Sequence, residues 1–251
     1  MKVTFLGTGT SRGVPIIGCQ CRVCHSSDPR NHRLRTSILL QSKASIVIDT
    51  SVDFRSQMLR YGVKRLDAVL FTHSHADHIL GLDDVYPFNI WSKKRIPAYA
   101  SPETLEQIRI TFRHLFSENP YPGTPKVDLV PIEGDFWIGD LNFHPVEVFH
   151  GQLPVLGFRI GDFAYITDVS YIPEQSMQQL EGVKCLVLDG LRYKSHPTHF
   201  SLSEAAETAL QLGAVETHLI HMTHEVDHDE GNSVLPESVK LAYDGQVLKI
   251  G

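Results

Sequence analysis

Short apolar runs alternate with polar, turn-rich segments along the whole chain. Most of these runs are four to six residues rich in Val, Ile, Phe or Leu, and Gly, Pro, Asp or Ser bounds them. This pattern predicts β-strands. They cover residues 2–6, 36–40, 45–48, 68–71, 98–100, 143–148, 157–160, 163–166, 185–188 and 218–220.

Helical segments lie between these strands. Ser101 and Pro102 provide an N-cap and a proline at the first helical position, which predicts a helix over residues 102–116. A second helix is predicted over residues 203–212, with Gly213 as its C-cap. Residues 120–125 read as a surface loop. Strands mixed with helices, without a repeat or linker, predict one α/β domain over residues 1–251.

Composition narrows the class of protein. A chain of 251 residues can bury roughly three quarters of its unfolded surface without disulfides. The net charge of -6 argues against a strongly basic nucleic-acid surface, although Lys93, Lys94 and Arg95 could form a local basic rim. No apolar run is long enough for a signal peptide core or a membrane span, which predicts a cytoplasmic protein without membrane partners. Cys185 lies in an apolar run and is expected in the core.

A cluster of ligand-type side chains follows the strand predicted at residues 68–71. His73, His75, Asp77 and His78 fall within six residues, on a loop that lets successive side chains converge. A lone histidine is usually an ordinary polar residue, but four such groups at this spacing are hard to explain as packing. Imidazole and carboxylate suit Zn, Mn or Fe and do not choose among them.

The pattern His-x-His-x-Asp-His after an apolar strand resembles the signature of the metallo-β-lactamase superfamily. That resemblance implies an αββα sandwich with two metal ions at one edge of the facing sheets. It assigns His73, His75 and His150 to one ion, Asp77, His78 and His221 to the other, and Asp168 to both. It also gives Asp49 a supporting role behind the ligands, although Ser51 stands where the family has glycine. His144 matches no motif position and is expected to be structural or exposed.

A second candidate site lies in the loop at about residues 18–25. Cys19, Cys21 and Cys24 need one further ligand to complete a tetrahedral zinc site. His25, His32 and His224 are the candidates, and His25 is so close to Cys24 that it would strain the chelate.

The same loop narrows the resemblance to one branch of the superfamily. Together with the Gly7-Thr8-Gly9 and Gly13-Val14-Pro15 segments, it resembles the phosphoribosyl cyclic phosphodiesterase branch, the carbon–phosphorus lyase accessory enzymes. This resemblance implies that His224 is the fourth ligand of a structural zinc. It also suggests a homodimer.

These motifs predict a phosphodiesterase. Two divalent ions roughly 3.5–4 Å apart can lower the pKa of a shared water toward neutrality and stabilise charge in the transition state. With the substrate that the resemblance implies, a small cyclic phosphodiester, metal-bound hydroxide is expected to attack phosphorus, and Asp77 is suited to hold that hydroxide for in-line attack. His199 resembles the branch's non-ligand pocket histidine and is expected to protonate the leaving group or contact phosphate. His196 is a weaker candidate, and spacing does not select among Arg33, Arg35, Arg192 and Tyr193 as substrate contacts.

Three alternatives remain. A tRNA 3′-end processing endonuclease uses the same core ligands but needs a protruding basic arm, and no long insertion is visible in the sequence. A thioester or lactam hydrolase often varies the position of Asp77 or lacks the cysteine cluster. A metal-binding scaffold without turnover is disfavoured by the complete ligand set and by His199.

Overall fold

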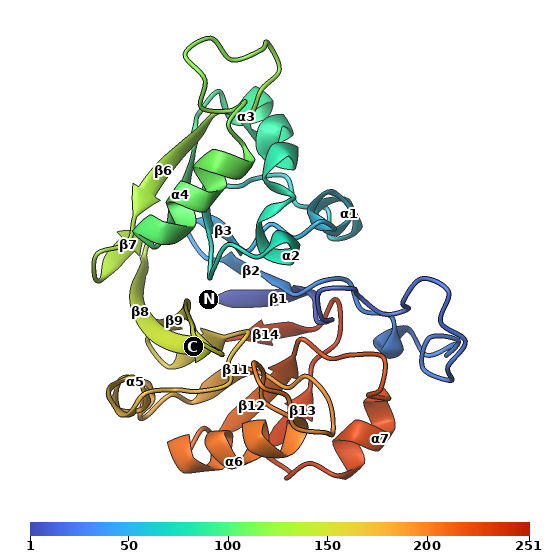
Figure 1. Cartoon of the computed structure of the whole chain (residues 1–251). Helices are drawn as coiled ribbons and strands as arrows, with labels where there is room; N and C mark the ends of the chain where they lie inside the picture. The colour runs from blue at the N-terminus through green and yellow to red at the C-terminus, as the bar shows by residue number, and fades with distance from the viewer.

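The computed structural model describes residues 1–251, and two seven-stranded mixed sheets face each other at its centre (Figure 1). The first sheet contains β1 (Lys2–Gly7), β2 (Ser37–Gln41), β3 (Ser45–Ile48), β4 (Ala68–Leu70), β5 (Ile96–Ala100), β6 (Val127–Pro131) and β14 (Val247–Lys249). The second contains β7 (Phe136–Ile138), β8 (Leu141–His150), β9 (Leu153–Ile160), β10 (Phe163–Ile166), β11 (Cys185–Asp189), β12 (Glu216–Ile220) and β13 (Val239–Leu241). The strand orders are β14-β1-β2-β3-β4-β5-β6 and β13-β12-β11-β10-β9-β8-β7.

Helices cover the outer faces of both sheets. Those on the first sheet are α1 (Phe54–Arg60), α2 (Ala76–Ile79), the 3-10 helix η2 (Leu82–Val85), α3 (Tyr86–Ser92) and α4 (Pro102–Thr111). Those on the second side are α5 (Glu174–Leu180), α6 (Leu202–Leu212) and α7 (His228–Ser233), while the 3-10 helix η1 (Pro29–Asn31) lies in the amino-terminal loop. The architecture is therefore the αββα sandwich that the sequence predicts. None of the helices combines the length and the apolar composition needed to cross a lipid bilayer.

Alternating side chains build three apolar layers. In β3, Ile46 and Ile48 point between the two sheets, while Val47 points outward under α1 and α3. In β11, Val187 points inward, while Leu186 packs under α6. Because the central strands are buried on both faces, they appear in the sequence as continuous apolar runs.

Most of the predicted elements are confirmed, with boundaries shifted by a few residues. All ten predicted strands are present, and Ser101 and Ser201 cap α4 and α6 through their side chains. The helix predicted to reach residue 116 ends at Thr111, because the chain turns there while Phe112 and Leu115 still pack into the core. Strands β6, β7, β13 and β14 and the short helices α1, α2, α3, α5 and α7 were not predicted.

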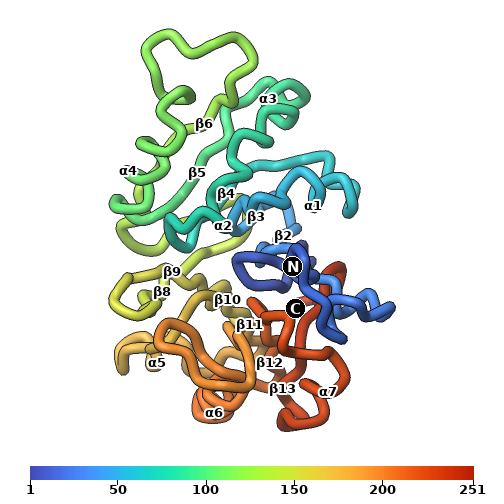
Figure 2. The backbone as a smooth tube through the Cα atoms, turned by 45° about the vertical axis from the view of Figure 1, so that its right-hand side comes forward, coloured from blue at the N-terminus to red at the C-terminus, as the bar shows by residue number.

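Segments far apart in sequence meet at the two edges of the sandwich. The amino group of Met1 donates a hydrogen bond to the carbonyl of Ile250 at 2.6 Å, and the two ends of the chain lie near each other in the tube view (Figure 2). The Gly7–Thr10 segment pairs with the loop after β12, where Thr10 N–H donates to the Met222 carbonyl at 3.1 Å. The amino-terminal loop is thereby tied to the carboxyl-terminal part of the chain.

Close backbone contacts explain the glycine at position 7. A Cβ atom there would lie 2.0 Å from the carbonyl oxygen of Arg35. We expect Gly7→Ala to lower the free energy of unfolding by about 1–3 kcal/mol, as overpacking does. A urea titration would measure this, with Gly134→Ala as the matched control because a Cβ at Gly134 meets nothing within 4 Å. Equal stability of the two variants would contradict the packing described here.

Candidate metal centre

The candidate ligands lie where strands end at one edge of the sandwich. Asp49 follows β3, His73 lies three residues beyond β4, Asp168 lies two residues beyond β10, and His221 follows β12. His150 is the last residue of β8. Asp49, Asp168 and His221 adopt left-handed backbone conformations with φ of 64°, 53° and 65°. Such strain costs of order 1–3 kcal/mol per residue and is retained where a function needs the resulting side-chain direction.

The structure brings the seven predicted dinuclear ligands together. The ring of His73 lies 4.5 Å from that of His75 and 4.2 Å from that of His78, and His75 lies 5.1 Å from His150, all measured between centroids. These contacts place the first predicted ligand set, His73, His75 and His150, beside His78 of the second.

The acidic side chains complete the cluster. Asp168 lies between two histidines, because its carboxylate oxygens are each 3.3 Å from a ring nitrogen, Nε2 of His78 and Nε2 of His221. Asp77 lies 3.3 Å from the same atom of His78 and 3.8 Å from that of His221. Asp77 and Asp168 therefore both lie against the Nε2 atoms of His78 and His221.

Several imidazoles have one nitrogen fixed and the other free. His78 Nδ1 lies 2.7 Å from a carboxylate oxygen of Asp49, which also accepts hydrogen bonds from the backbone and hydroxyl of Thr72. His150 Nδ1 donates to the carbonyl of Thr198 at 2.6 Å. The Nε2 atoms of His73 and His78 are buried and have no hydrogen-bond partner, and neither ring nitrogen of His221 has one. Metal-binding histidines have this arrangement, so these residues fit divalent cations.

Buried negative charge favours cations at the same place. Asp49, Asp168 and Asp189 are almost fully buried, and no Lys or Arg forms an ion pair with them. Burial opposes ionisation of Asp168, yet His221 and His78 hold its pKa well below the usual range. Burial likewise opposes the charge on His221, but Asp168 and Asp77 raise its pKa to about 9. Divalent cations are stronger counter-charges for such carboxylates than imidazolium rings.

His199 lies beside the ligand cluster, and a carboxylate that the sequence did not single out orients it. Its Nδ1 lies 2.9 Å from Asp189 Oδ2, and its ring is 4.4 Å from His150 and 4.8 Å from His221. Asp189 also places Oδ1 3.7 Å from Nδ1 of His221. It ends β11 as Asp49 follows β3, and this strand-ending aspartate was the only local signal for its role.

Other predicted residues lie elsewhere. Arg33 is buried and donates to the hydroxyl of Thr8 and the carbonyl of Ala242, so it holds the amino-terminal loop and does not face substrate. His144 pairs with Asp135 outside the cluster, as expected for a structural or exposed residue.

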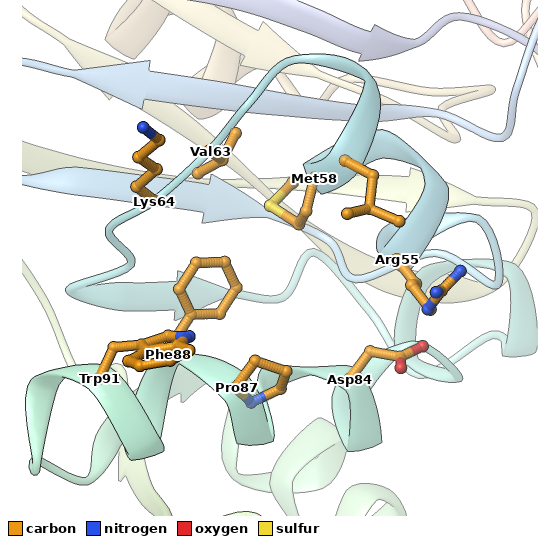
Figure 3. A pocket seen from close by; sticks show the side chains of 9 residues that line it. Arg55, Met58, Val63, Lys64, Asp84, Pro87, Phe88 and Trp91 are labelled. Carbon is orange, nitrogen blue, oxygen red and sulfur yellow. The ribbon is translucent and has the colours of Figure 1, made fainter.

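A cavity of about 530 Å³ between α1 and α3 is lined by Met58, Phe88 and Trp91 among others (Figure 3). None of the candidate ligands lines this cavity. This cavity is therefore separate from the candidate metal centre.

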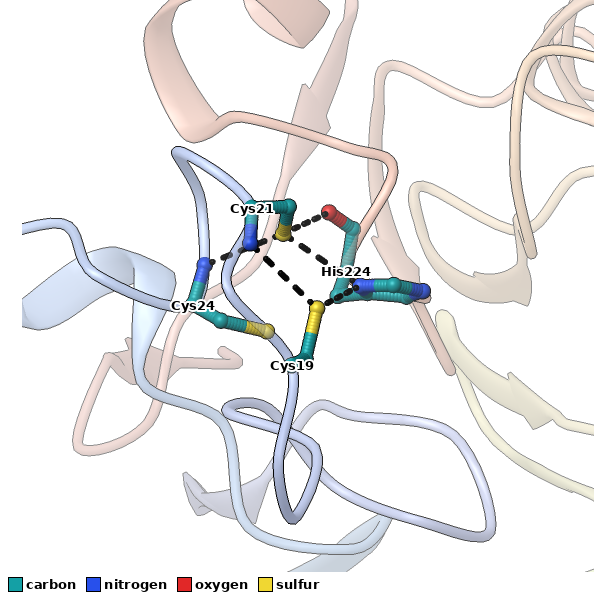
Figure 4. Close-up of side chains that lie close together, drawn as sticks. All are labelled: Cys19, Cys21, Cys24 and His224. Atoms are coloured by element: carbon teal, nitrogen blue, oxygen red, sulfur yellow. Dashed lines mark hydrogen bonds between the residues drawn. The ribbon is translucent and has the colours of Figure 1, made fainter.

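The three clustered cysteines converge on His224 (Figure 4). His224 Nδ1 lies 3.2 Å from Cys19 Sγ and 3.3 Å from Cys21 Sγ, and the four ligand atoms lie within 4.8 Å of one another. The backbone N–H of Cys24 donates to Cys21 Sγ, and this hydrogen bond is the main cause that lowers the pKa of Cys21 to about 6. Three thiols and one imidazole with thiolate character fit a closed tetrahedral zinc site. The imidazole of His25 lies 3.2 Å from the Cys19 carbonyl and does not belong to the ligand set.

We expect Cys21→Ser to remove one zinc per chain and to lower stability. At free zinc about a hundredfold above its Kd, losing the site costs about 2.7 kcal/mol. Elemental analysis and thermal unfolding would measure both effects. His25→Ala is the matched control, because it lies in the same loop but outside the ligand set. An unchanged zinc content in Cys21→Ser, or an equal loss in His25→Ala, would contradict the assignment.

Comparisons with known proteins identify the family. The model of the β-lactamase superfamily domain matches residues 44–222. A crystal structure of a new diphosphatase from the PhnP family superposes with a TM-score of 0.93 and 42% identity, covering 100% of this chain and 98% of that one.

Two curated proteins are also similar. The first is an octanoyltransferase of Porphyromonas gingivalis, which is 42% identical over 98% of this chain and 51% of its own length. The chain thus spans about half the length of that relative. The second is a ribonuclease Z of Bradyrhizobium diazoefficiens, 36% identical over 34% of this chain and 24% of its own length.

The fold, the ligand cluster and these matches agree. The resemblance to the branch of the carbon–phosphorus lyase accessory enzymes is confirmed by the PhnP-family structure. The diphosphatase activity of that protein, and the activities of the octanoyltransferase and the ribonuclease Z, are properties of those proteins. The chain belongs to the metallo-β-lactamase superfamily and, within it, to the PhnP family.

Proposed function

We propose that residues 1–251 form one phosphodiesterase domain that holds two divalent ions and hydrolyses a small cyclic phosphodiester. The observation that carries this proposal is the position of Asp168 between His78 and His221, with His199 beside the same cluster. Two ligand sets sharing a carboxylate suit a pair of ions, and a histidine outside both sets suits proton transfer.

The side chains divide between the two proposed ions. His73, His75 and His150 would hold one ion, and Asp77, His78 and His221 the other. Bound there, the ions would supply water activated at neutral pH and positive charge for phosphoryl oxygens. Asp168 would fix their separation.

His199 would deliver a proton from Nε2 to the leaving oxygen. Asp189 Oδ2 lies 2.9 Å from the opposite ring nitrogen, Nδ1, so the ring is oriented with Nε2 free to face the leaving oxygen. A ring-opening alkoxide needs this proton, because it is a poor leaving group.

A second candidate is hydrolysis of a diphosphate linkage. The supporting observation is the PhnP-family diphosphatase that is 42% identical along the whole chain. Both reactions take place at phosphorus and use the same ligands, but a phosphate leaving group needs less help from a general acid than an alkoxide does. Dependence on the leaving group therefore distinguishes the two.

The test is a substrate panel on protein loaded with manganese or zinc. It contains a five-membered cyclic ribose phosphate, bis(p-nitrophenyl) phosphate, a dinucleoside diphosphate, a precursor tRNA and an acyl thioester. We expect the cyclic ester to give the highest kcat/KM. Preference for the dinucleoside diphosphate would favour the second candidate, and cleavage of only the tRNA or the thioester would overturn both.

The cellular setting is part of the same proposal. Three thiols in one zinc-type cluster suit a reducing compartment, so we propose a cytoplasmic enzyme. We also propose a homodimer, which size-exclusion chromatography with light scattering would test.

A further inference from the structure

A second cluster of metal-ligand side chains lies at the opposite end of the second sheet. Cys185 begins β11, Glu216 begins β12, and the two residues are register partners. His218 follows two residues later, so its side chain emerges on the same face as that of Glu216. The catalytic cluster adjoins the other ends of these strands, roughly 13 Å away at about 3.3 Å per residue.

The three side chains point their ligand atoms at one another. Cys185 Sγ, a carboxylate oxygen of Glu216 and a ring nitrogen of His218 lie within 4.8 Å of one another. His218 Nε2 is 3.7 Å from Glu216 Oε2, which is too long for a hydrogen bond. Only 6% of His218 is exposed, and its buried Nε2 has no hydrogen-bond partner. A buried, unpartnered imidazole nitrogen aimed at a thiol and a carboxylate calls for a ligand.

Solvent reaches the cluster through a cavity of about 310 Å³. Cys185 and Glu216 line it together with Lys184, Lys249 and the terminal Gly251. The side chain of Glu216 is 53% exposed, whereas Cys185 and His218 lie beneath it. A hydrated ion can therefore meet the carboxylate first and then the two buried ligands.

The surroundings make Cys185 a poor nucleophile and keep the His218 ring ready to bind a metal. Burial, with the nearby charge of Glu216, raises the pKa of the Cys185 thiol. A thiol that stays protonated is a poor nucleophile, and it has to release its proton before it binds a metal. Burial lowers the pKa of His218, which keeps the ring neutral as metal binding requires.

We propose that Cys185, Glu216 and His218 bind one zinc-type divalent ion, with water as the fourth ligand. One sulfur, one imidazole nitrogen and one carboxylate oxygen form a donor set that suits a borderline-soft, tetrahedral cation. The ion joins the starts of β11 and β12 and takes no part in hydrolysis at the other edge.

Binding requires two proton movements. The thiol of Cys185 releases its proton to solvent as the sulfur–metal bond forms. Gln246 Nε2 lies 3.2 Å from His218 Nδ1, so Nε2 carries the ring proton before binding. On binding this proton moves to Nδ1, and Gln246 turns its amide so that its oxygen accepts the new N–H.

Cadmium NMR on the full chain tests this site against the other two. The cadmium shift depends on the number of sulfur ligands, so a site with one thiolate is resolved from the three-thiolate cluster and from the sulfur-free catalytic cluster. We expect a one-thiolate resonance in the wild-type protein. Cys185→Ala removes it, while Cys21→Ser and His75→Ala retain it.

Glu216→Gln is a second variant of this site, and it is expected to fold because the Glu216 side chain is half exposed. It should weaken cadmium binding at the one-thiolate site at least about tenfold, since even residues behind a ligand cost 10–100-fold when replaced. Glu237→Gln, at a position outside the cluster, should leave the affinity unchanged. Absence of the resonance in the wild type, its survival in Cys185→Ala, or equal affinity in both glutamine variants would overturn the proposal.

Discussion

Replacing Asp168 with asparagine should lower kcat on a phosphodiester by on the order of 10³-fold or more, because several kcal/mol of transition-state stabilisation would depend on the proposed pair of ions. Asp168 is the only carboxylate within 3.3 Å of ring nitrogens from both His78 and His221. Asparagine retains the shape and tolerates the left-handed backbone that Asp168 adopts at φ 53°. The substitution therefore removes the negative charge between His78 and His221 and leaves the chain path intact.

Kinetics and metal analysis on the same sample measure this effect. We expect the asparagine variant to retain at most one of the two ions after dialysis. Asp128→Asn is the matched control, because Asp128 is exposed and pairs with Arg95 far from the cluster. Full activity of Asp168→Asn, or two retained ions, would contradict the bridging role.

The second large effect concerns His199. We expect His199→Ala to lower kcat about 10²–10⁴-fold on a cyclic phosphodiester, the usual contribution of a general acid. The loss on bis(p-nitrophenyl) phosphate should be far smaller, because p-nitrophenolate leaves without protonation. A contrast between the two substrates separates proton donation from phosphate binding.

His196→Ala is the control for this prediction. His196 lies 5.3 Å from the ring of His199 between centroids, and its Nδ1 contacts Thr198, so it belongs to the same loop without reaching Asp189. Asp189→Asn should follow His199→Ala in direction, since it removes the orienting carboxylate. Equal losses of His199→Ala on both substrates would indicate a phosphate contact and contradict the role as acid.

The central strands could be predicted from the sequence because burial on two faces leaves an unbroken apolar run. β14 could not, because its three residues lie at a sheet edge and Val247 and Lys249 are exposed. The helices α1 and α3 are short, and their apolar residues pack against strands distant in sequence. Local periodicity carries too little signal for such elements.

The residues of the candidate site likewise differ in how far the sequence alone predicts them. His73, His75, Asp77 and His78 are neighbours in sequence, so their spacing alone indicated a metal. His150, Asp168 and His221 come together only because β8, β10 and β12 end at one edge, and the family resemblance placed them before the structure did. The contact of Asp189 with His199 depends on tertiary structure, and the local sequence shows only that an aspartate ends a strand.

The burial of Arg33 and of His218 could not be predicted from the sequence, for a physical reason. Charged and polar side chains are usually exposed, so a pattern gives no ground for burying them. Arg33 is tolerated inside because Thr8 and the carbonyl of Ala242 accept its hydrogen bonds. His218 is held between the sheets by Phe5 and Gln246, which come from the other sheet and the turn before β14.

Anomalous X-ray diffraction from crystals of the manganese- or zinc-loaded protein is the most direct measurement of the paired-ion centre. We expect two peaks roughly 3.5–4 Å apart. One should lie against His73, His75 and His150, the other against Asp77, His78 and His221, with Asp168 contacting both. A single peak, or none, among these side chains in an otherwise ordered crystal would contradict the two-ion mechanism.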